Sequence, residues 1–137
     1  MKTVLFLCVH NAGRSQMAEA LTNHRARAQG LDVRAASAGT VGGKELNPLA
    51  VQVMEEIGVS MADHAPKLVT QEMVDRADRI ISMGCGVDAQ ACPAQFILTE
   101  DWGLDDPAGL PIERVREIRD KIDRHIDELL AQLGGSP

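Results

Sequence analysis

The stretch KTVLFLCVHNAGRS, residues 2–15, decides the fold class of this 137-residue chain. Its first half contains a continuous apolar run over 3–7, which is typical of a β-strand that is covered on both faces. From residue 15 to residue 29 the apolar residues recur at helical spacing, and Gly30 then provides a natural helix end. The sequence therefore predicts a buried strand that passes through a short loop directly into a helix.

The alternation of strands and helices continues along the chain. Further strands are predicted over 32–39, 79–83 and 95–98, and further helices over 47–58, 70–78 and 111–133. This order predicts an α/β fold with a parallel sheet and right-handed crossovers. Ligands of such sheets bind beyond the carboxyl ends of the strands. Cys8 lies at that end of the first strand.

Composition narrows the class of protein. The chain is 45% hydrophobic but only 2% aromatic, and its formal net charge is −6. We expect one catalytic domain over 1–137, monomeric, that binds neither nucleic acid nor a membrane.

The first apolar run is too short for a signal peptide and is soon followed by Asn11 and Arg14, so we expect a cytoplasmic protein. Three cysteines in a reducing compartment do not suit a disulfide framework.

The loop CVHNAGRS has the properties of an anion site. Backbone N–H groups at the start of a helix have no partner within the helix and attract oxyanions. The predicted oxyanion-binding residues are Val9, His10, Asn11, Ala12, Gly13, Arg14 and Ser15. The same environment favours a thiolate at Cys8, with a pKa below the usual value of about 8.5. Ser15 could cap the helix or bond the thiolate. A buried, inert cysteine is the alternative, but strand, small loop and Arg-Ser in this order favour the anion loop.

The motif Cys-x5-Arg-Ser directly after the first strand resembles the low-molecular-weight protein tyrosine phosphatase fold. SAGT, NPLAVQVMEEIG and DDPAG follow in the order that this fold uses, so the resemblance covers nearly the whole chain. It implies a four-stranded parallel sheet in the order 2-1-3-4, flanked by helices. The fold supports phosphomonoester hydrolysis and, in thioredoxin-coupled arsenate reductases, reduction of arsenate to arsenite.

The segment SMGCGVDAQACPAQ carries Cys85 and Cys92 with the spacing of the second and third cysteines of those reductases, followed by Pro93. The resemblance implies a relay in which Cys8 attacks arsenate, Cys85 and then Cys92 resolve the adduct, and thioredoxin reduces the product. No metal or organic cofactor is implied. If 85–92 were helical, the two thiols would be about 10 Å apart along the axis, so a Cys85–Cys92 disulfide requires the segment to unwind.

Three further positions bear on the chemistry. The resemblance makes Asp106 in DDPAG the general acid, although paired aspartates also occur in ordinary turns. Gly13 stands where many phosphatases of this fold have a second cysteine. Lys67 matches the position of an aspartate with which some reductases bind potassium, so its ammonium group could replace that ion beside Glu19 and Asn11, or could simply be solvated.

Three alternatives to the relay remain at this level. The chain could be a tyrosine phosphatase, although the absence of tyrosine and the scarcity of other aromatic residues disfavour an aryl phosphate substrate. It could be an arsenate reductase recycled by mycothiol or glutathione, for which a separate resolving Cys92 would be redundant. A non-enzymatic thiol sensor would have no need of Arg14 and the anion loop.

Overall fold

A computed structural model of the chain describes residues 2–41, 45–83, 100–104, 107 and 109–133. Its elements, in chain order, are β1 (Lys2–Cys8), α1 (Arg14–Gln29), β2 (Val33–Gly39), α2 (Pro48–Glu55), α3 (Gln71–Arg76), β3 (Arg79–Ser82), β4 (Glu100–Asp101) and α4 (Ile112–Leu133). The four strands form one sheet in the order β2-β1-β3-β4, and all three strand pairs are parallel. The predicted α/β class and strand order are confirmed.

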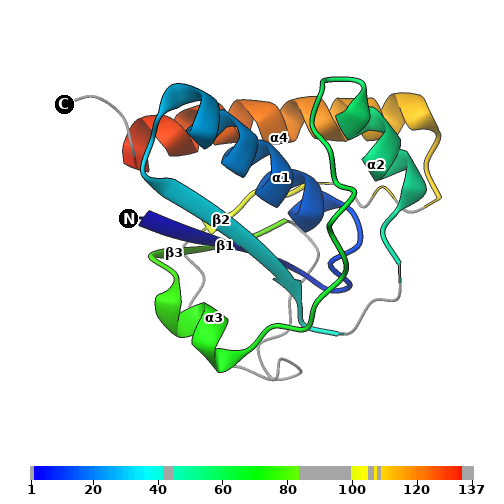
Figure 1. Cartoon of the computed structure of the whole chain (residues 1–137). Helices are drawn as coiled ribbons and strands as arrows, with labels where there is room; N and C mark the ends of the chain where they lie inside the picture. The colour runs from blue at the N-terminus through cyan, green and yellow to red at the C-terminus, as the bar shows by residue number, and fades with distance from the viewer. Residues whose placement is uncertain (1, 42–44, 84–99, 105–106, 108, 134–137) are drawn as a thin grey trace.

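The two faces of the sheet are covered unequally. Helices α1, α2 and α4 lie together on one face, and the short α3 lies on the other (Figure 1). Along β1, Val4, Phe6 and Cys8 join the larger apolar cluster with these helices, whereas Leu5 and Leu7 join a smaller cluster on the face of α3. This two-sided burial explains the continuous apolar run of β1, and it turns Cys8 toward the face that carries α1.

Several element boundaries differ from the sequence prediction. Gly30 ends α1 in the left-handed conformation as predicted. The helix over 47–58 is shorter, because α2 stops at Glu55 and the chain turns through Gly58, which has a φ of 77°. The strand next to β3 is Glu100–Asp101, two polar residues without a strand pattern. The predicted strand over 95–98 lies outside the described residues. Within the described part of the chain, no helix is long and apolar enough to span a membrane.

Trp102 belongs to the core and not to a site entrance. Its side chain is buried, its ring stacks on that of His125 with centroids 4.7 Å apart, and it lies 5.2 Å from the ring of Phe6. Both aromatic side chains of the described residues, Phe6 and Trp102, are therefore buried. Because Trp102 is buried in the core, its ring is not available to contact a substrate.

An ion-pair cluster joins α2 to α4 and gives a pH-dependent prediction. Arg116 and Arg119 both bond the carboxylate of Glu56. The hydrogen bond from Arg116, followed by that from Arg119, lowers the pKa of Glu56 below its ordinary value of 4.5. A lowered carboxyl pKa in the fold contributes stability above the ordinary pKa, and this is lost as pH falls through the folded pKa. We expect Glu56→Gln to lower the Tm slightly at pH 7.

The Tm difference between wild type and Glu56→Gln should shrink as the pH falls below 4.5, because both proteins then carry a neutral side chain at this position. Glu55→Gln is the matched control, since it removes a neighbouring exposed charge that is not part of the cluster. Thermal unfolding between pH 3 and 7 measures the Tm of wild type and of both variants. A Glu56→Gln effect that stays constant over this range would contradict the prediction.

Candidate active site

The loop between β1 and α1 is fixed to its surroundings through its carbonyl groups. The bonds are Thr40 N–H to Cys8 O (3.0 Å), Val41 N–H to Val9 O (2.8 Å), Asn47 N–H to Ala12 O (2.8 Å) and Met17 N–H to Gly13 O (2.9 Å). In a trans peptide the C=O and the following N–H point in opposite directions. The N–H groups of Val9, His10, Gly13 and Arg14 are therefore directed away from these partners, as a backbone anion cradle requires.

The sulfur of Cys8 lies inside this loop. Its side chain is almost fully buried. The Asn11 N–H donates to Cys8 Sγ at 3.0 Å, and Ser15 Oγ lies 2.9 Å from the same atom. Asn11 reaches this position through a left-handed backbone with a φ of 58°, a conformation that asparagine tolerates better than most residues. The loop thus surrounds the sulfur with hydrogen-bond donors.

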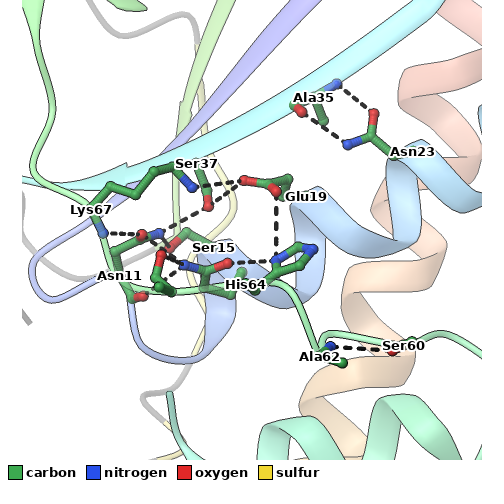
Figure 2. Close-up of polar contacts among 12 residues, drawn as sticks. Asn11, Ser15, Glu19, Asn23, Ala35, Ser37, Ser60, Ala62, His64 and Lys67 are labelled. Carbon is green, nitrogen blue, oxygen red and sulfur yellow. Dashed lines mark hydrogen bonds and ion pairs between the residues drawn. The ribbon is translucent and has the colours of Figure 1, made fainter. Parts of the chain in front are cut away.

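The side chain of Asn11 leaves the Ser15 hydrogen available to Cys8. The backbone N–H of Lys67 can only donate, so the Asn11 atom that it meets at 2.9 Å is the carbonyl Oδ1. Asn11 Nδ2 then donates to Ser15 Oγ at 2.8 Å and to Ser37 Oγ at 3.0 Å. Because the Ser15 oxygen accepts from Asn11, its own hydrogen is available to Cys8 Sγ. Figure 2 shows the bonds of Asn11 to Ser15, Ser37 and Lys67. A hydrogen bond from Ser15 to Cys8 Sγ favours a thiolate.

A second layer of polar side chains holds Asn11. Gln16 Nε2 donates to the carbonyl oxygens of Asn11 and Ala65, so Gln16 Oε1 faces His64 Nδ1 at 2.7 Å and that nitrogen carries a proton. Glu19 accepts from Ser37 at 2.7 Å and lies 3.4 Å from Lys67 Nζ (Figure 2). The segment before α3 is thereby tied to the Cys8 loop, and Lys67 lies beside Glu19 and Asn11, as one of the two interpretations of the sequence expected.

Arg14 is the first residue of α1 and is buried beneath the loop. Its Nη1 donates to the carbonyl oxygens of Met83 at 3.2 Å and Leu104 at 2.7 Å. These bonds fix the planar guanidinium between the end of β3 and the segment that follows β4. The residue capping α1 is Gly13, without a side-chain bond. Ser15 is therefore placed for the thiol and not for the helix cap, which resolves the two roles that the sequence allowed.

The structure brings Cys8, Arg14, Ser15 and the loop residues together, whereas Cys85, Cys92 and Asp106 lie outside the described residues. The sequence prediction did not identify Ser37, Gln16 or His64 as supports of the site. It also missed the reason for Gly39, where an added Cβ would lie 2.6 Å from Val9 O. For Ser37 and Gly39 the sequence did contain a signal, because both belong to the string SAGT that matches the family's order of motifs. Among the described residues, no group of three or more His, Cys, Asp or Glu side chains could hold a metal ion.

The fold and the loop together define a class of enzyme. A parallel sheet carries a cysteine at its carboxyl edge, in a loop that opens a helix and includes a buried arginine, and this is the arrangement of a cysteine nucleophile for tetrahedral oxyanions. The family described as low molecular weight phosphotyrosine protein phosphatase matches residues 3–136. The chain belongs to this family, whose members include arsenate reductases.

Three similar proteins place the chain within the family. Arsenate reductase 2 of Staphylococcus epidermidis is 31% identical over 92% of this chain and 94% of its own length. The structure of an arsenate reductase in the phosphate binding state has a TM-score of 0.82, with 30% identity over 98% of this chain and all of the other. A thioredoxin-dependent arsenate reductase of Corynebacterium glutamicum is 34% identical, with a TM-score of 0.72, over 97% of this chain and 62% of its own.

Proposed function

We propose that this enzyme reduces arsenate to arsenite with a three-cysteine relay and is recycled by thioredoxin. The observation that carries the proposal is the environment of Cys8, whose sulfur receives donors from Asn11 and Ser15 above a buried Arg14. This environment suits a thiolate that attacks a tetrahedral oxyanion. The identity to proteins named arsenate reductase supports arsenate as the oxyanion.

The first proposed step joins sulfur to arsenic. Loop N–H groups and the Arg14 guanidinium hold arsenate, and the Cys8 thiolate attacks the arsenic atom. An arsenic–oxygen bond breaks, and Asp106 supplies the proton with which hydroxide leaves as water. Arsenic remains As(V) in the resulting Cys8 adduct.

The second proposed step is the reduction. The Cys85 thiolate attacks Cys8 Sγ, a disulfide forms, and the electron pair of the sulfur–arsenic bond leaves with arsenic as As(III) arsenite. Two thiols are thereby oxidised as one arsenate is reduced. Cys92 then attacks Cys85 and releases the Cys8 thiolate, leaving a Cys85–Cys92 disulfide. The dithiol of thioredoxin reduces this disulfide by thiol exchange. The description of the similar Corynebacterium glutamicum arsenate reductase as thioredoxin-dependent supports this donor.

Phosphatase activity is the second candidate, and it is favoured by the family itself. The same loop, thiolate and acid serve phosphomonoester hydrolysis, so we propose a slow hydrolysis of p-nitrophenyl phosphate as a side reaction. Within the described part of the chain both aromatic side chains, Phe6 and Trp102, are buried, so this part offers no exposed ring on which an aryl substrate could stack. Recycling by mycothiol or glutathione is the remaining alternative.

Coupled turnover tests the proposed function. Arsenate is added to the enzyme with thioredoxin, thioredoxin reductase and NADPH, and in parallel with glutathione and glutaredoxin, with mycothiol and its redoxin, or with p-nitrophenyl phosphate alone. The proposal expects sustained NADPH oxidation and arsenite production in the thioredoxin reaction. Turnover only with a low-molecular-weight thiol would show that this thiol, and not thioredoxin, is the electron donor. Hydrolysis of p-nitrophenyl phosphate without any arsenite production would show a phosphatase and not a reductase.

Lys67 gives a prediction about monovalent cations. Its ammonium lies 3.4 Å from Glu19 Oε1, and Glu19 is mostly buried. We propose that this tethered charge takes the place of the potassium ion that some reductases bind here. Wild-type turnover should then be the same in sodium and in potassium buffers. Lys67→Ala should lower turnover by at most about fivefold, the range of a partly solvated ion pair, and potassium should partly restore it.

The matched control for Lys67 is Lys121→Ala, which removes an exposed lysine on α4, away from the loop. It should leave turnover unchanged in both buffers. Strong potassium stimulation of the wild type, or a loss in Lys67→Ala that sodium and potassium relieve equally, would contradict the substitution of an ion by Lys67.

A further inference from the structure

Gly39, the last residue of β2, lies directly against the backbone of the Cys8 loop. It is part of an extended strand and its φ is outside the left-handed region, so its own conformation does not require glycine. An added Cβ would instead lie 2.6 Å from Val9 O, 3.0 Å from Val41 O and 3.1 Å from the carbonyl carbon of His10. All three are main-chain atoms, which cannot rotate away as the end of a flexible side chain can. The loop backbone therefore occupies the place of a side chain at position 39.

The backbone of Gly39 is held in place and cannot retreat from the loop. Its N–H donates to Lys67 O at 2.7 Å, and its carbonyl accepts from the Val69 N–H at 2.9 Å. On the side of β1, Gly39 pairs with Cys8, and the next N–H along the chain, that of Thr40, donates to Cys8 O at 3.0 Å. A larger residue at position 39 would therefore displace the loop before it displaced the strand.

The peptide unit in closest contact with position 39 belongs to the anion cradle. The Val9 carbonyl accepts from the Val41 N–H at 2.8 Å, so its direction is fixed. The His10 N–H is part of the same peptide unit and points the opposite way, among the donors of the cradle. Pushing Val9 O away from an added Cβ would rotate this unit and turn the His10 N–H away from a bound oxyanion.

We propose that Gly39 is a positioning residue, whose missing side chain allows the peptide between Val9 and His10 to direct its N–H at the oxyanion. The inference deepens the proposed function, because it rests on the Cys8 loop as the site that binds arsenate. It also gives the glycine of SAGT a role in the chemistry. Strand β2 ends in a residue without a side chain at the point where the nucleophile loop crosses it.

The thiol should be affected less than the oxyanion site. The N–H that donates to Cys8 Sγ is that of Asn11, in the following peptide unit, whose carbon atom would lie at the longer distance of 3.1 Å from the added Cβ. Asn11 is also held independently, because its side chain accepts from the Lys67 N–H at 2.9 Å. A substitution at position 39 should therefore separate oxyanion affinity from thiol reactivity, two properties that would be lost together if the loop unfolded.

Phosphate protection of Cys8 tests the proposal in Gly39→Ala. Alkylation of Cys8 by iodoacetamide is followed by mass spectrometry of its peptide at rising concentrations of inorganic phosphate. We expect phosphate to bind about 10- to 100-fold more weakly than in wild type, as when one hydrogen bond to a charged group is lost. Alkylation without phosphate should stay close to the wild-type rate. Ala36→Ser, which adds one atom to a half-buried residue of the same strand, is the matched control and should bind phosphate normally.

Two results for Gly39→Ala would overturn the proposal. The first is wild-type phosphate affinity with a raised Tm, which is the usual effect of replacing glycine by alanine within a strand when the added methyl group has space. The second is a change in the alkylation rate as large as the change in phosphate affinity, since Gly39 would then maintain the loop as a whole and not direct one donor.

A measurement on the wild type applies even if Gly39→Ala does not fold. In an amide NMR titration with inorganic phosphate, the His10 resonance should move downfield more than that of Thr40, whose N–H is already bonded to Cys8 O. A His10 resonance that does not move would overturn the proposal. Because phosphate is not reduced, these results are independent of turnover. If they hold while the wild type produces no arsenite, the role of Gly39 stands and the proposed reaction fails.

Discussion

Cys8→Ser is expected to abolish arsenate reduction, with a loss of at least about 1,000-fold, as is typical when a covalent nucleophile is removed. A serine hydroxyl ionises far less readily than a thiol, so attack on arsenic is slow. Any oxygen adduct that did form would also be a dead end, because Cys85 could not make a disulfide with an oxygen atom. Arsenite release after incubation with arsenate and thioredoxin measures the effect.

The same variant should keep its fold and its affinity for oxyanions. Oxygen is slightly smaller than sulfur and would accept the same bonds from Asn11 and Ser15, and Arg14 keeps its bonds to Met83 and Leu104. Phosphate binding by calorimetry and the Tm should therefore remain close to wild type. Arsenite production at an unaltered rate would show that another group attacks arsenate. A collapse of the Tm would show instead that the thiol is structural.

The fold was largely predictable from local pattern. An apolar run covered on both faces, a helical repeat and a stop at Gly30 are properties of neighbouring residues, and they predicted β1 and α1 within one residue at most boundaries. The strand order required the resemblance to a known family. β4 could not be predicted, since Glu100 and Asp101 join the sheet through pairing with Ile81 and Ser82 and not through any property of their own side chains.

The supports of the site were less accessible to sequence reasoning than its chemistry. Cys8, Arg14 and Ser15 share one loop, whereas the groups that hold Asn11 include the hydroxyl of Ser37 in β2 and the backbone N–H of Lys67 in the segment before α3. Ser37 and Lys67 lie 26 and 56 residues away from Asn11 along the chain. Such contacts depend on tertiary packing, and an isolated serine or histidine has no local pattern.

The second large effect concerns Cys92, which acts in the relay only after arsenite has left. Cys92→Ser should therefore complete one reduction and stop with Cys8 joined to Cys85, because nothing within the chain releases Cys8. Cys85→Ser should fail one step earlier and release little arsenite without an added thiol. Mass spectrometry of alkylated digests identifies the joined cysteines. Cys8 is almost fully buried, so thioredoxin should reduce the trapped disulfide poorly.

The amount of arsenite released per chain by Cys92→Ser, in the presence of excess arsenate, thioredoxin, thioredoxin reductase and NADPH, tests the relay most directly. The account predicts about one arsenite per chain, the stoichiometry of a single internal disulfide, whereas the wild type continues for many turnovers and Cys85→Ser stays near zero. Sustained turnover by Cys92→Ser at the wild-type rate with thioredoxin alone would contradict the three-cysteine relay.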